Sequence, residues 1–171
     1  MYPDFPGLVS ELAKTRQELM ATDLQVVCFT NGDTLSDNAI VGALNSLDQT
    51  YLKIDYGSER AFKKFNRPRT RTTLEKIIQG AKSLKNLSVQ TTVLGGDASL
   101  DSPARLDEWL EVIAMLSPNE VVLTLGQPPF RELEQAASGL TVATEDDLHR
   151  LSHWLDRRLR IKARVGFSGA A

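Results

Sequence analysis

Lys53 and Asp55 stand two residues apart in the apolar segment YLKIDY. Alternate side chains of a β-strand point to the same face, so both charges lie on one face while Leu52 and Ile54 lie on the other. A parallel strand normally has both faces covered, so two charges within it require an explanation. At the C-terminal end of a barrel strand they are well placed to bind a polar ligand. An internal ion pair that satisfies only itself is an equally open interpretation.

A basic segment follows at residues 60–71, where six cations occur without any acidic residue. The cations are Arg60, Lys63, Lys64, Arg67, Arg69 and Arg71. Phe62 and Phe65 lie between them. Arginine side chains fit phosphate oxygens, so the segment is suited to bind a phosphate, an RNA segment or an acidic partner. A solvated helix face that directs its two phenylalanines to the core explains the same pattern.

Metal chemistry requires ligands that this composition scarcely supplies. The sequence contains one cysteine, Cys28, in the apolar run VVCFT, and two histidines, His149 and His153. A structural zinc site or an iron–sulfur cluster needs three or four such ligands. We therefore predict no metal site, a buried structural thiol at Cys28 and two surface histidines.

The 171 residues are 42% hydrophobic and 25% charged, with a net charge of −2. These values predict a single globular domain over residues 1–171 and indicate neither a nucleic acid nor a membrane as partner. No apolar run approaches the roughly 20 residues that span a bilayer, and the first residues contain no signal-peptide core. We expect a cytoplasmic protein.

Strand-like and helix-like segments alternate along the chain. Strands are predicted at residues 24–30, 51–55, 87–94 and 120–125, with a short strand at 161–165, and helices at 7–21, 36–47, 73–85, 102–116 and 147–159. The capping pairs are Thr72 with Glu75 and Thr144 with Asp147. Residues 130–142 are predicted to be a loop or one poor helical turn. Strict alternation predicts an α/β fold with a parallel sheet.

The first predicted strand, LQVVCFT, has no preceding strand to pair with in this sequence. A bare hydrophobic edge is something that natural proteins usually avoid. We therefore expect either an upstream segment or chain beside it, or self-association through this edge.

Six sequence pieces occur in a family-like order and cover nearly all of residues 2–164. They are YPDFPGLVSEL, CFTNG, LKIDYGSERAFKKFNRP, TTLEKIIQGAKSL, VQTTVLGGD and PNEVVLTLGQPP. They resemble the later part of radical S-adenosylmethionine (radical SAM) iron–sulfur oxidoreductases, in particular the group that includes the tRNA wyosine-synthesis enzymes. The resemblance implies a partial (β/α) TIM-like barrel whose first two units are missing.

The resemblance also assigns cofactor-binding positions at the C-terminal ends of the strands. These are Asn31, Lys53, Asp55, Gly95, Thr124 and Gln127. It implies that Asn31 and Asp55 hold S-adenosylmethionine, that Lys53 binds or balances substrate charge, and that Thr124 lies near the adenine. Asn31 with Gly32 is equally explained as a turn, and the glycines that follow residue 94 as a loop without a ligand.

Members of this family bind a [4Fe–4S] cluster through a CxxxCxxC motif and carry a GGEP-like motif after the second strand, and neither motif is present here. Because thiolates are indispensable ligands of such a cluster, the chain alone is predicted to be inactive. It would supply the S-adenosylmethionine side of a pocket whose cluster side belongs to an upstream segment or partner chain. The alternatives are a non-catalytic module that binds RNA or a protein through residues 60–71, and a truncated gene product.

Overall fold

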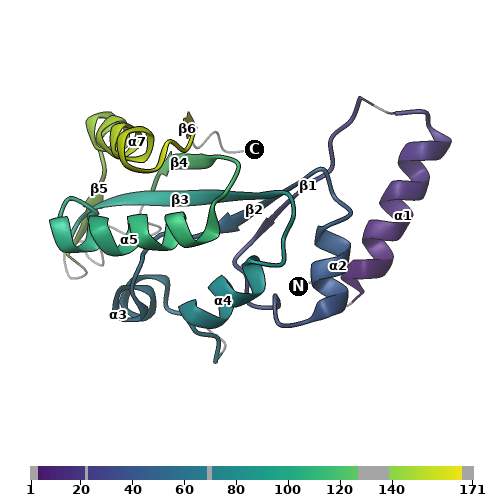
Figure 1. Cartoon of the computed structure of the whole chain (residues 1–171), viewed down its shortest axis with the longest axis horizontal. Helices are drawn as coiled ribbons and strands as arrows, with labels where there is room; N and C mark the ends of the chain where they lie inside the picture. Colours follow the sequence, from purple (N-terminus) through teal and green to yellow (C-terminus); the bar gives the residue numbers. More distant parts are fainter. Residues whose placement is uncertain (1–3, 22, 69–70, 127–138, 167–171) are drawn as a thin grey trace.

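The computed structural model describes residues 4–21, 23–68, 71–126 and 139–166, and strands and helices alternate through them (Figure 1). In chain order the elements are α1 (Phe5–Glu18), β1 (Val27–Thr30), α2 (Asn38–Leu44), β2 (Gln49–Lys53), α3 (Glu59–Ala61), the π-helix η1 (Phe62–Asn66), α4 (Leu74–Ala81), β3 (Leu87–Gly96), α5 (Pro103–Leu116), β4 (Val121–Leu125), β5 (Leu140–Val142), α7 (Glu145–Leu159) and β6 (Ala163–Gly166). None of the described helices is both long and apolar enough to cross a membrane.

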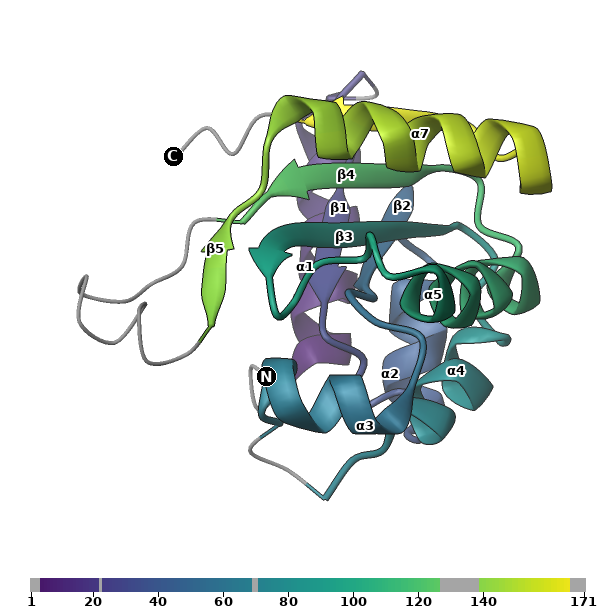
Figure 2. The same ribbon diagram turned by 90° about the vertical axis from the view of Figure 1, so that its left-hand side faces the viewer.

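Five strands form one parallel sheet in the order β1-β2-β3-β4-β6. Strands that follow one another in chain order, with helical connections between them, build a section of a (β/α) barrel. The sheet is not closed, because β1 and β6 are its two ends in the described part of the chain. Figure 2 shows β3 and β4 side by side, with α5 near β3 and α7 near β4. The predicted α/β class and partial barrel are confirmed.

The two faces of this sheet differ in composition. Leu52, Val89 and Leu123 alternate onto one face and are fully buried in the core beneath the helices. The opposite face is only partly covered, and we call it the open face. Its residues include Phe29, Tyr51, Lys53, Gln90, Thr92 and Thr124, which the strand register aligns. The prediction that Lys53 and Leu52 lie on opposite faces of the strand is therefore confirmed.

The chain that leaves β2 is fixed to the helical layer at one backbone carbonyl. The carbonyl oxygen of Ile54 accepts hydrogen bonds from Thr91 Oγ1 at 2.7 Å and from the indole Nε1 of Trp109 at 3.2 Å. Trp109 is completely buried on α5, and Ile54 is buried beside it. Because both donors are buried, the position of the next residue, Asp55, is fixed by the core.

The end of the sheet differs from the prediction at β5. Residues 130–142 were predicted to be a loop or a poor helical turn, but β5 pairs antiparallel with the end of β3, Leu94 opposite Val142. The physical reason is that β3 continues to Gly96, beyond its neighbours, and offers unpaired backbone groups to any nearby segment. A three-residue strand of this kind leaves no periodic pattern in the sequence.

Several element boundaries also shift by one to four residues. The strand predicted at 51–55 begins at Gln49 and ends at Lys53, so Asp55 lies just beyond it. The helix predicted at 73–85 runs from Leu74 to Ala81, and its cap is Thr73 instead of the predicted Thr72; the Thr73 side chain accepts the Lys76 N–H. The capping box of Thr144 with Asp147 is confirmed.

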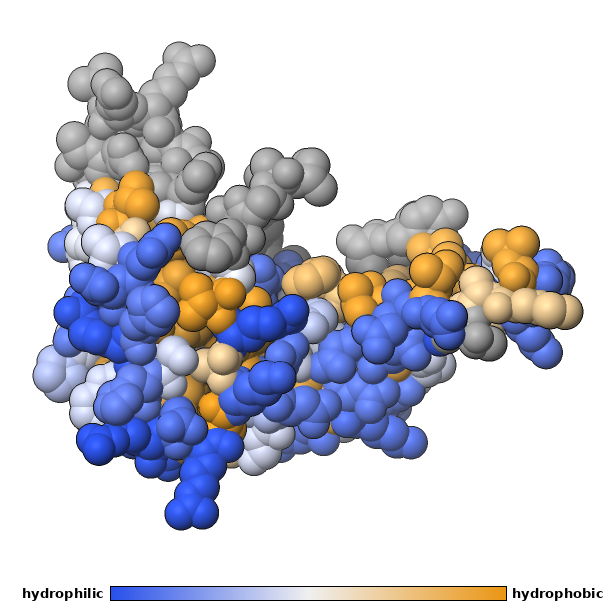
Figure 3. All heavy atoms as spheres, turned by 90° about the horizontal axis from the view of Figure 1, so that it is seen from above, coloured by the Kyte–Doolittle hydropathy of each residue, from blue (hydrophilic) through white to orange (hydrophobic). Residues whose placement is uncertain are grey.

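The predicted hydrophobic edge is present at β1. In the described residues β1 pairs only with β2, and the side chains of Val27 and Phe29 are exposed. Further exposed hydrophobic residues precede β1, namely Leu19, Met20 and Leu24. Figure 3 shows hydrophobic side chains gathered over α1 and the segment that leads into β1, on the right of the view.

Candidate functional site

A pocket of about 340 Å³ lies at the carboxyl ends of β1 and β2, and we call it the strand-end pocket. It is lined by Asn31, Asp33, Lys53, Phe62, Asn66, Arg67 and Pro68. Asn31 follows β1 directly, Lys53 ends β2, and Phe62 and Asn66 are the first and last residues of η1. The structure thus brings together three residues that the sequence analysis named separately, Asn31, Lys53 and Arg67. Polar groups at the carboxyl ends of parallel strands are where barrel folds place their ligands.

The carboxylate of Asp55 supports this pocket, and its side chain is only 6% exposed. Its Oδ1 accepts the backbone N–H of Thr92 at 2.8 Å. Its Oδ2 lies 2.7 Å from Lys53 Nζ and also accepts a hydrogen bond of 2.7 Å from Asn66 Nδ2. Three donors satisfy most of the capacity of one buried carboxylate. Asp55 therefore positions Lys53 and Asn66, and those two residues line the pocket.

Two hydrogen-bonding groups of this network have no partner in the described part of the chain. Lys53 Nζ carries three N–H groups and directs two of them at Asp55 and at Thr92 Oγ1, the latter at 2.7 Å. Asn66 Oδ1 is buried and has no hydrogen-bond partner. Because a carboxylate only accepts hydrogen bonds, Nδ2 of Asn66 must face Asp55, which fixes Oδ1 as a free acceptor. A buried acceptor without a partner costs about 1–3 kcal/mol, so a donor from a ligand would stabilise it.

The backbone around Arg67 adopts two uncommon conformations in succession. Residues Phe62–Asn66 form a π-helix, and Arg67 follows in the left-handed region with φ of 45°. Short π-helical turns occur frequently at functional sites, and a left-handed residue other than glycine is costly. The combination places Asn66 and Arg67 together at the pocket. The adjacent contact of the Tyr56 and Phe65 rings, with centroids 5.0 Å apart, holds η1 against the core.

Asn31 takes part in a turn as well as in the pocket. Its side-chain Oδ1 accepts the backbone N–H of Asp33 at 3.2 Å, and Gly32 has φ of 81°. A Cβ at Gly32 would lie 2.7 Å from Ile77 and 2.9 Å from Leu52, so only glycine fits this turn. The turn explanation is confirmed, and it presents Asn31 at the pocket wall.

Two further predicted cofactor residues, Thr124 and Gly95, do not line the strand-end pocket. Thr124 lies on the open face opposite Thr92, and its Oγ1 donates to the Thr91 carbonyl at 3.4 Å. Gly95 lines a different polar hollow, and a Cβ there would collide with Thr141 of β5. Close pairing with β5 is therefore a sufficient reason for this glycine. Gln127 and Arg69 lie outside the described residues.

The basic segment is divided among several contacts. Lys63 lies 3.1 Å from Glu59, and Lys64 lies 3.5 Å from Asp97. Arg67 lines the strand-end pocket. The side chains of Arg60 and Arg71 are exposed. These cations thus do not line one common pocket. The phosphate or RNA contacts predicted for Arg60, Lys64, Arg67 and Arg71 stay a prediction.

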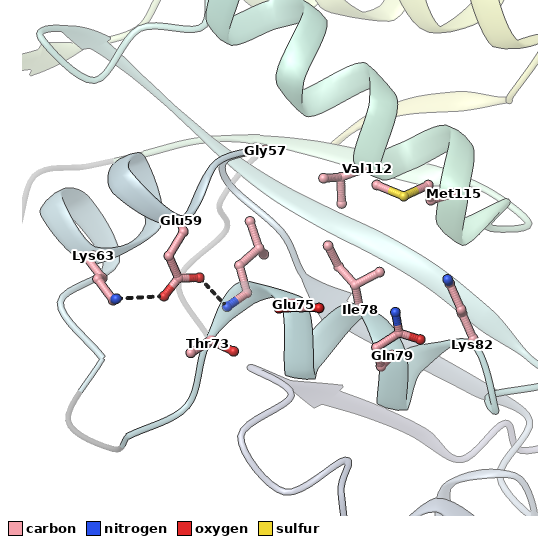
Figure 4. Close-up of a pocket in the computed structure, with 11 residues that line it drawn as sticks. Gly57, Glu59, Lys63, Thr73, Glu75, Ile78, Gln79, Lys82, Val112 and Met115 are labelled. Atoms are coloured by element: carbon pink, nitrogen blue, oxygen red, sulfur yellow. Dashed lines mark hydrogen bonds and ion pairs between the residues drawn. The ribbon is translucent and has the colours of Figure 1, made fainter.

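A second hollow, of about 500 Å³, lies among α3, η1, α4 and α5, and we call it the outer groove (Figure 4). Ile78, Val112 and Met115 meet across it, as Figure 4 shows. At one end the Glu59 carboxylate accepts the backbone N–H of Leu74 at 2.7 Å. That bond satisfies a free N–H in the first turn of α4, so Glu59 has a structural role there.

The sequence analysis did not name Asn66 as a site residue. It also missed Asp33, which belongs to the turn punctuation after β1. The hydrogen bond between Asn66 and Asp55 spans eleven residues and depends on the π-helical turn. Helical periodicity of 3.6 residues does not reveal such a contact.

Comparison with known proteins gives matches in structure only: no family model and no curated protein sequence matches this chain. A domain of pyruvate-formate lyase-activating enzyme from Bacteroides vulgatus ATCC 8482 matches with a TM-score of 0.64 and 10% identity, over 97% of this chain and 96% of that one. SuiB from Streptococcus suis, in a structure bound to S-adenosylmethionine, matches with a TM-score of 0.64 and 12% identity. That match covers 99% of this chain and 36% of SuiB. At these identities the likeness establishes the fold, and the chain has the partial barrel fold of these two proteins.

Proposed function

We propose that this chain binds S-adenosylmethionine in the strand-end pocket, as the cofactor-holding part of a radical SAM enzyme. The observation that carries the proposal is the pocket's unsatisfied pair, the free N–H of Lys53 and the free acceptor Asn66 Oδ1. The structure of SuiB, which shares the fold, is bound to S-adenosylmethionine. The narrower relation to the group of tRNA wyosine-synthesis enzymes stays a sequence-based prediction.

The chemistry of the pocket fits this cofactor. S-adenosylmethionine carries a carboxylate, an amino group and two ribose hydroxyls. Lys53 and Arg67 supply cations for the carboxylate, and a guanidinium is especially suited to it. Asn66 Oδ1 and the Asp33 carboxylate are acceptors for the amino or hydroxyl groups. A volume of about 340 Å³ lies within the usual range for small-molecule sites.

The residues of this chain do not fit a [4Fe–4S] cluster. One cysteine in the whole sequence is too few for three thiolate ligands. In the described part of the chain, no group of three His, Cys, Asp or Glu side chains could hold a metal ion. We therefore assign cofactor binding and orientation to this chain and propose that another segment or partner chain, adjoining β1, carries the cluster.

Calorimetric titration with S-adenosylmethionine tests the proposal. Arg67→Gln leaves every contact of Asp55 intact and should weaken binding about tenfold, since one charge-assisted hydrogen bond is lost. Lys53→Met should weaken binding at least as much. Lys82→Met is the matched control, because Lys82 lines the outer groove and should leave binding unchanged. The proposal is wrong if the wild type does not bind, or if all three variants bind like it.

A further inference from the structure

Positive charge is concentrated at the end of α7 and in the segment that leads into β6. Five of the chain's 20 lysine and arginine residues lie within residues 157–164, without an acidic residue among them. They are Arg157, Arg158, Arg160, Lys162 and Arg164, and we call them the basic cluster. The net charge of −2 for the whole chain thus hides an uneven distribution. A local cluster of cations attracts a polyanion whatever the net charge of the chain.

Part of the basic cluster has no acidic partner. Arg158 forms an ion pair with Asp107, and Arg164 Nη2 lies 3.2 Å from Glu120 Oε1. Together with Asp156, which precedes the cluster, these carboxylates offset three of the five charges. The remaining members are exposed and form no ion pair with any residue that the structure describes; they are Arg157, Arg160 and Lys162. The cluster therefore keeps a surplus of positive charge.

The helix dipole explains only part of this arrangement. Cations in the last turn of a helix interact favourably with its negative end, which is reason enough for Arg157 and Arg158. α7 ends at Leu159, however, and Lys162 and Arg164 lie beyond it. Because the effect of the dipole falls off beyond the last turn, the second half of the cluster needs another explanation.

A groove of about 510 Å³ lies between α5 and α7, and we call it the α5–α7 groove. Its apolar lining includes Leu106 and Leu151, and the carboxylates of Asp101 and Asp107 in it are paired with arginines. Trp154 also lines the groove and is 37% exposed. The groove therefore combines an apolar wall with an indole that is open to solvent.

The α5–α7 groove and the basic cluster form one surface. The Arg158 guanidinium lines the groove and lies over the Trp154 ring, 4.7 Å from its centroid. Trp154, Arg157 and Arg160 follow one another at intervals of three residues. The Arg160 N–H still donates to the carbonyl of Asp156 at 3.1 Å, so the helical arrangement extends to this residue. Side chains three apart on a helix are neighbours, and the indole therefore lies beside the unpaired cations.

This surface lies at the opposite end of the sheet from the strand-end pocket. Figure 2 shows α7 running against the direction of β3 and β4, so that its last turn lies near the amino ends of the strands. There the Val121 N–H donates to the Lys162 carbonyl at 2.9 Å, which fixes the cluster beside the start of β4. No residue of the cluster or of the α5–α7 groove lines the strand-end pocket. The inference drawn from this surface goes beyond the proposed function and does not depend on it.

We propose that this surface binds single-stranded nucleic acid, with phosphate groups on Arg157 and Arg160 and a base stacked on Trp154. Guanidinium groups fit phosphate oxygens, and the stacking of a base on an aromatic side chain tolerates any base. Lys162 extends the positive surface beyond the helix. An acidic protein segment would account for the cations but not for an exposed indole among them, whereas a nucleic acid accounts for both.

Fluorescence anisotropy with labelled oligouridylate and oligothymidylate of about ten nucleotides measures this binding as a function of salt. Arg157→Gln together with Arg160→Gln should weaken binding about tenfold at about 0.1 M salt and reduce the slope of log K against log salt by about 1.4, since two phosphate contacts are lost. Arg60→Gln together with Arg71→Gln is the matched control, because it removes the same charge from two other exposed arginines and should leave binding unchanged. Tighter binding of one of the two oligonucleotides identifies RNA or DNA as the partner.

The stacking of a base on Trp154 has its own readout. The chain contains two tryptophans and Trp109 is completely buried, so quenching of fluorescence by an oligonucleotide reports on Trp154. Trp154→Leu should weaken binding about tenfold with an unchanged salt slope, because stacking is lost while the cations remain. Trp154→Phe should retain most of the affinity.

The inference is overturned if the wild type binds neither oligonucleotide at low salt, or if Trp154→Leu binds like the wild type. It is also overturned if the Arg60 and Arg71 variant loses as much affinity as the Arg157 and Arg160 variant. Equal competition by oligoglutamate would assign the cluster to an acidic protein instead. All variants of the cluster should bind S-adenosylmethionine like the wild type, so the failure of either proposal would leave the other standing.

Discussion

Two polar networks lie on the open face of the same sheet and differ in what they leave unsatisfied. The strand-end network joins Lys53, Asp55 and Asn66, and the mid-sheet network joins Tyr51, Glu120 and Arg164. In the first, the central carboxylate is 6% exposed, one N–H of Lys53 is free and Asn66 Oδ1 has no partner. This network therefore keeps one donor and one buried acceptor without a partner.

The mid-sheet network is closed on itself. Glu120 Oε1 accepts hydrogen bonds from Tyr51 at 3.0 Å and from Arg164 at 3.2 Å, and the Tyr51 hydroxyl both donates and accepts. The Arg164 side chain is 55% exposed, so water can replace its partners. Such a network orders side chains and has little capacity left for a ligand. The two networks therefore differ in their unsatisfied groups and not in the presence of charges.

Removing the central carboxylate of each network should give the largest difference in the free energy of unfolding between the two networks. Asp55→Ala leaves the Thr92 N–H, Lys53 and Asn66 without their acceptor in a buried place, so we expect the free energy of unfolding to fall by about 3 kcal/mol. Glu120→Ala should cost less than about 1 kcal/mol, because its partners regain water. Urea unfolding measures both values. Equal losses would contradict the distinction between the two networks.

The backbone of Arg67 offers a second way to separate stability from ligand binding. Arg67→Gly should raise the free energy of unfolding by about 1 kcal/mol, because glycine adopts φ of 45° without a Cβ penalty. The same variant should weaken S-adenosylmethionine binding, since the guanidinium is lost.

Ser117→Gly is the matched control for Arg67→Gly. Ser117 has the same φ of 45° at the end of α5, far along the chain from the strand-end pocket. This variant should be stabilised by a similar amount and should bind S-adenosylmethionine unchanged. Thermal unfolding and calorimetry report the two properties. If both variants lost affinity equally, Arg67 would have no specific part in binding.

The sequence predicted those features that arise from local periodicity. Alternation along residues 51–55 correctly placed Leu52 and Ile54 in the core, and the order of strands and helices correctly predicted an α/β fold with a parallel sheet. It did not predict Asn66 beside Asp55, because that contact needs a π-helix and a left-handed residue. It also did not predict the pairing of β3 with β5, which places Gly95 opposite Thr141. Each error concerns a contact made by tertiary packing, which overrides local propensity.

Two tyrosines, Tyr51 on β2 and Tyr56 three residues beyond its end, sharpen the comparison at the smallest scale. Tyr51→Phe removes a hydroxyl with two partners and should lower the free energy of unfolding by about 0.5 kcal/mol. Tyr56 is 4% exposed, and its buried hydroxyl has no hydrogen-bond partner. Tyr56→Phe should therefore raise the free energy of unfolding by about 0.5 kcal/mol, since an unsatisfied buried group is removed.

The same pair predicts how stability depends on pH. Burial, aided by the Asp55 charge, raises the pKa of Tyr56 above its ordinary value of 10.0. Below about pH 10 the phenol is neutral in both states, whereas above it the unfolded chain loses the proton first, so stability falls as pH rises. Urea unfolding from about pH 8 to about pH 11 should show a smaller decline for Tyr56→Phe than for the wild type. A decline of unchanged size would mean that the Tyr56 hydroxyl is not shielded from water, and its burial could not then explain the gain expected at neutral pH.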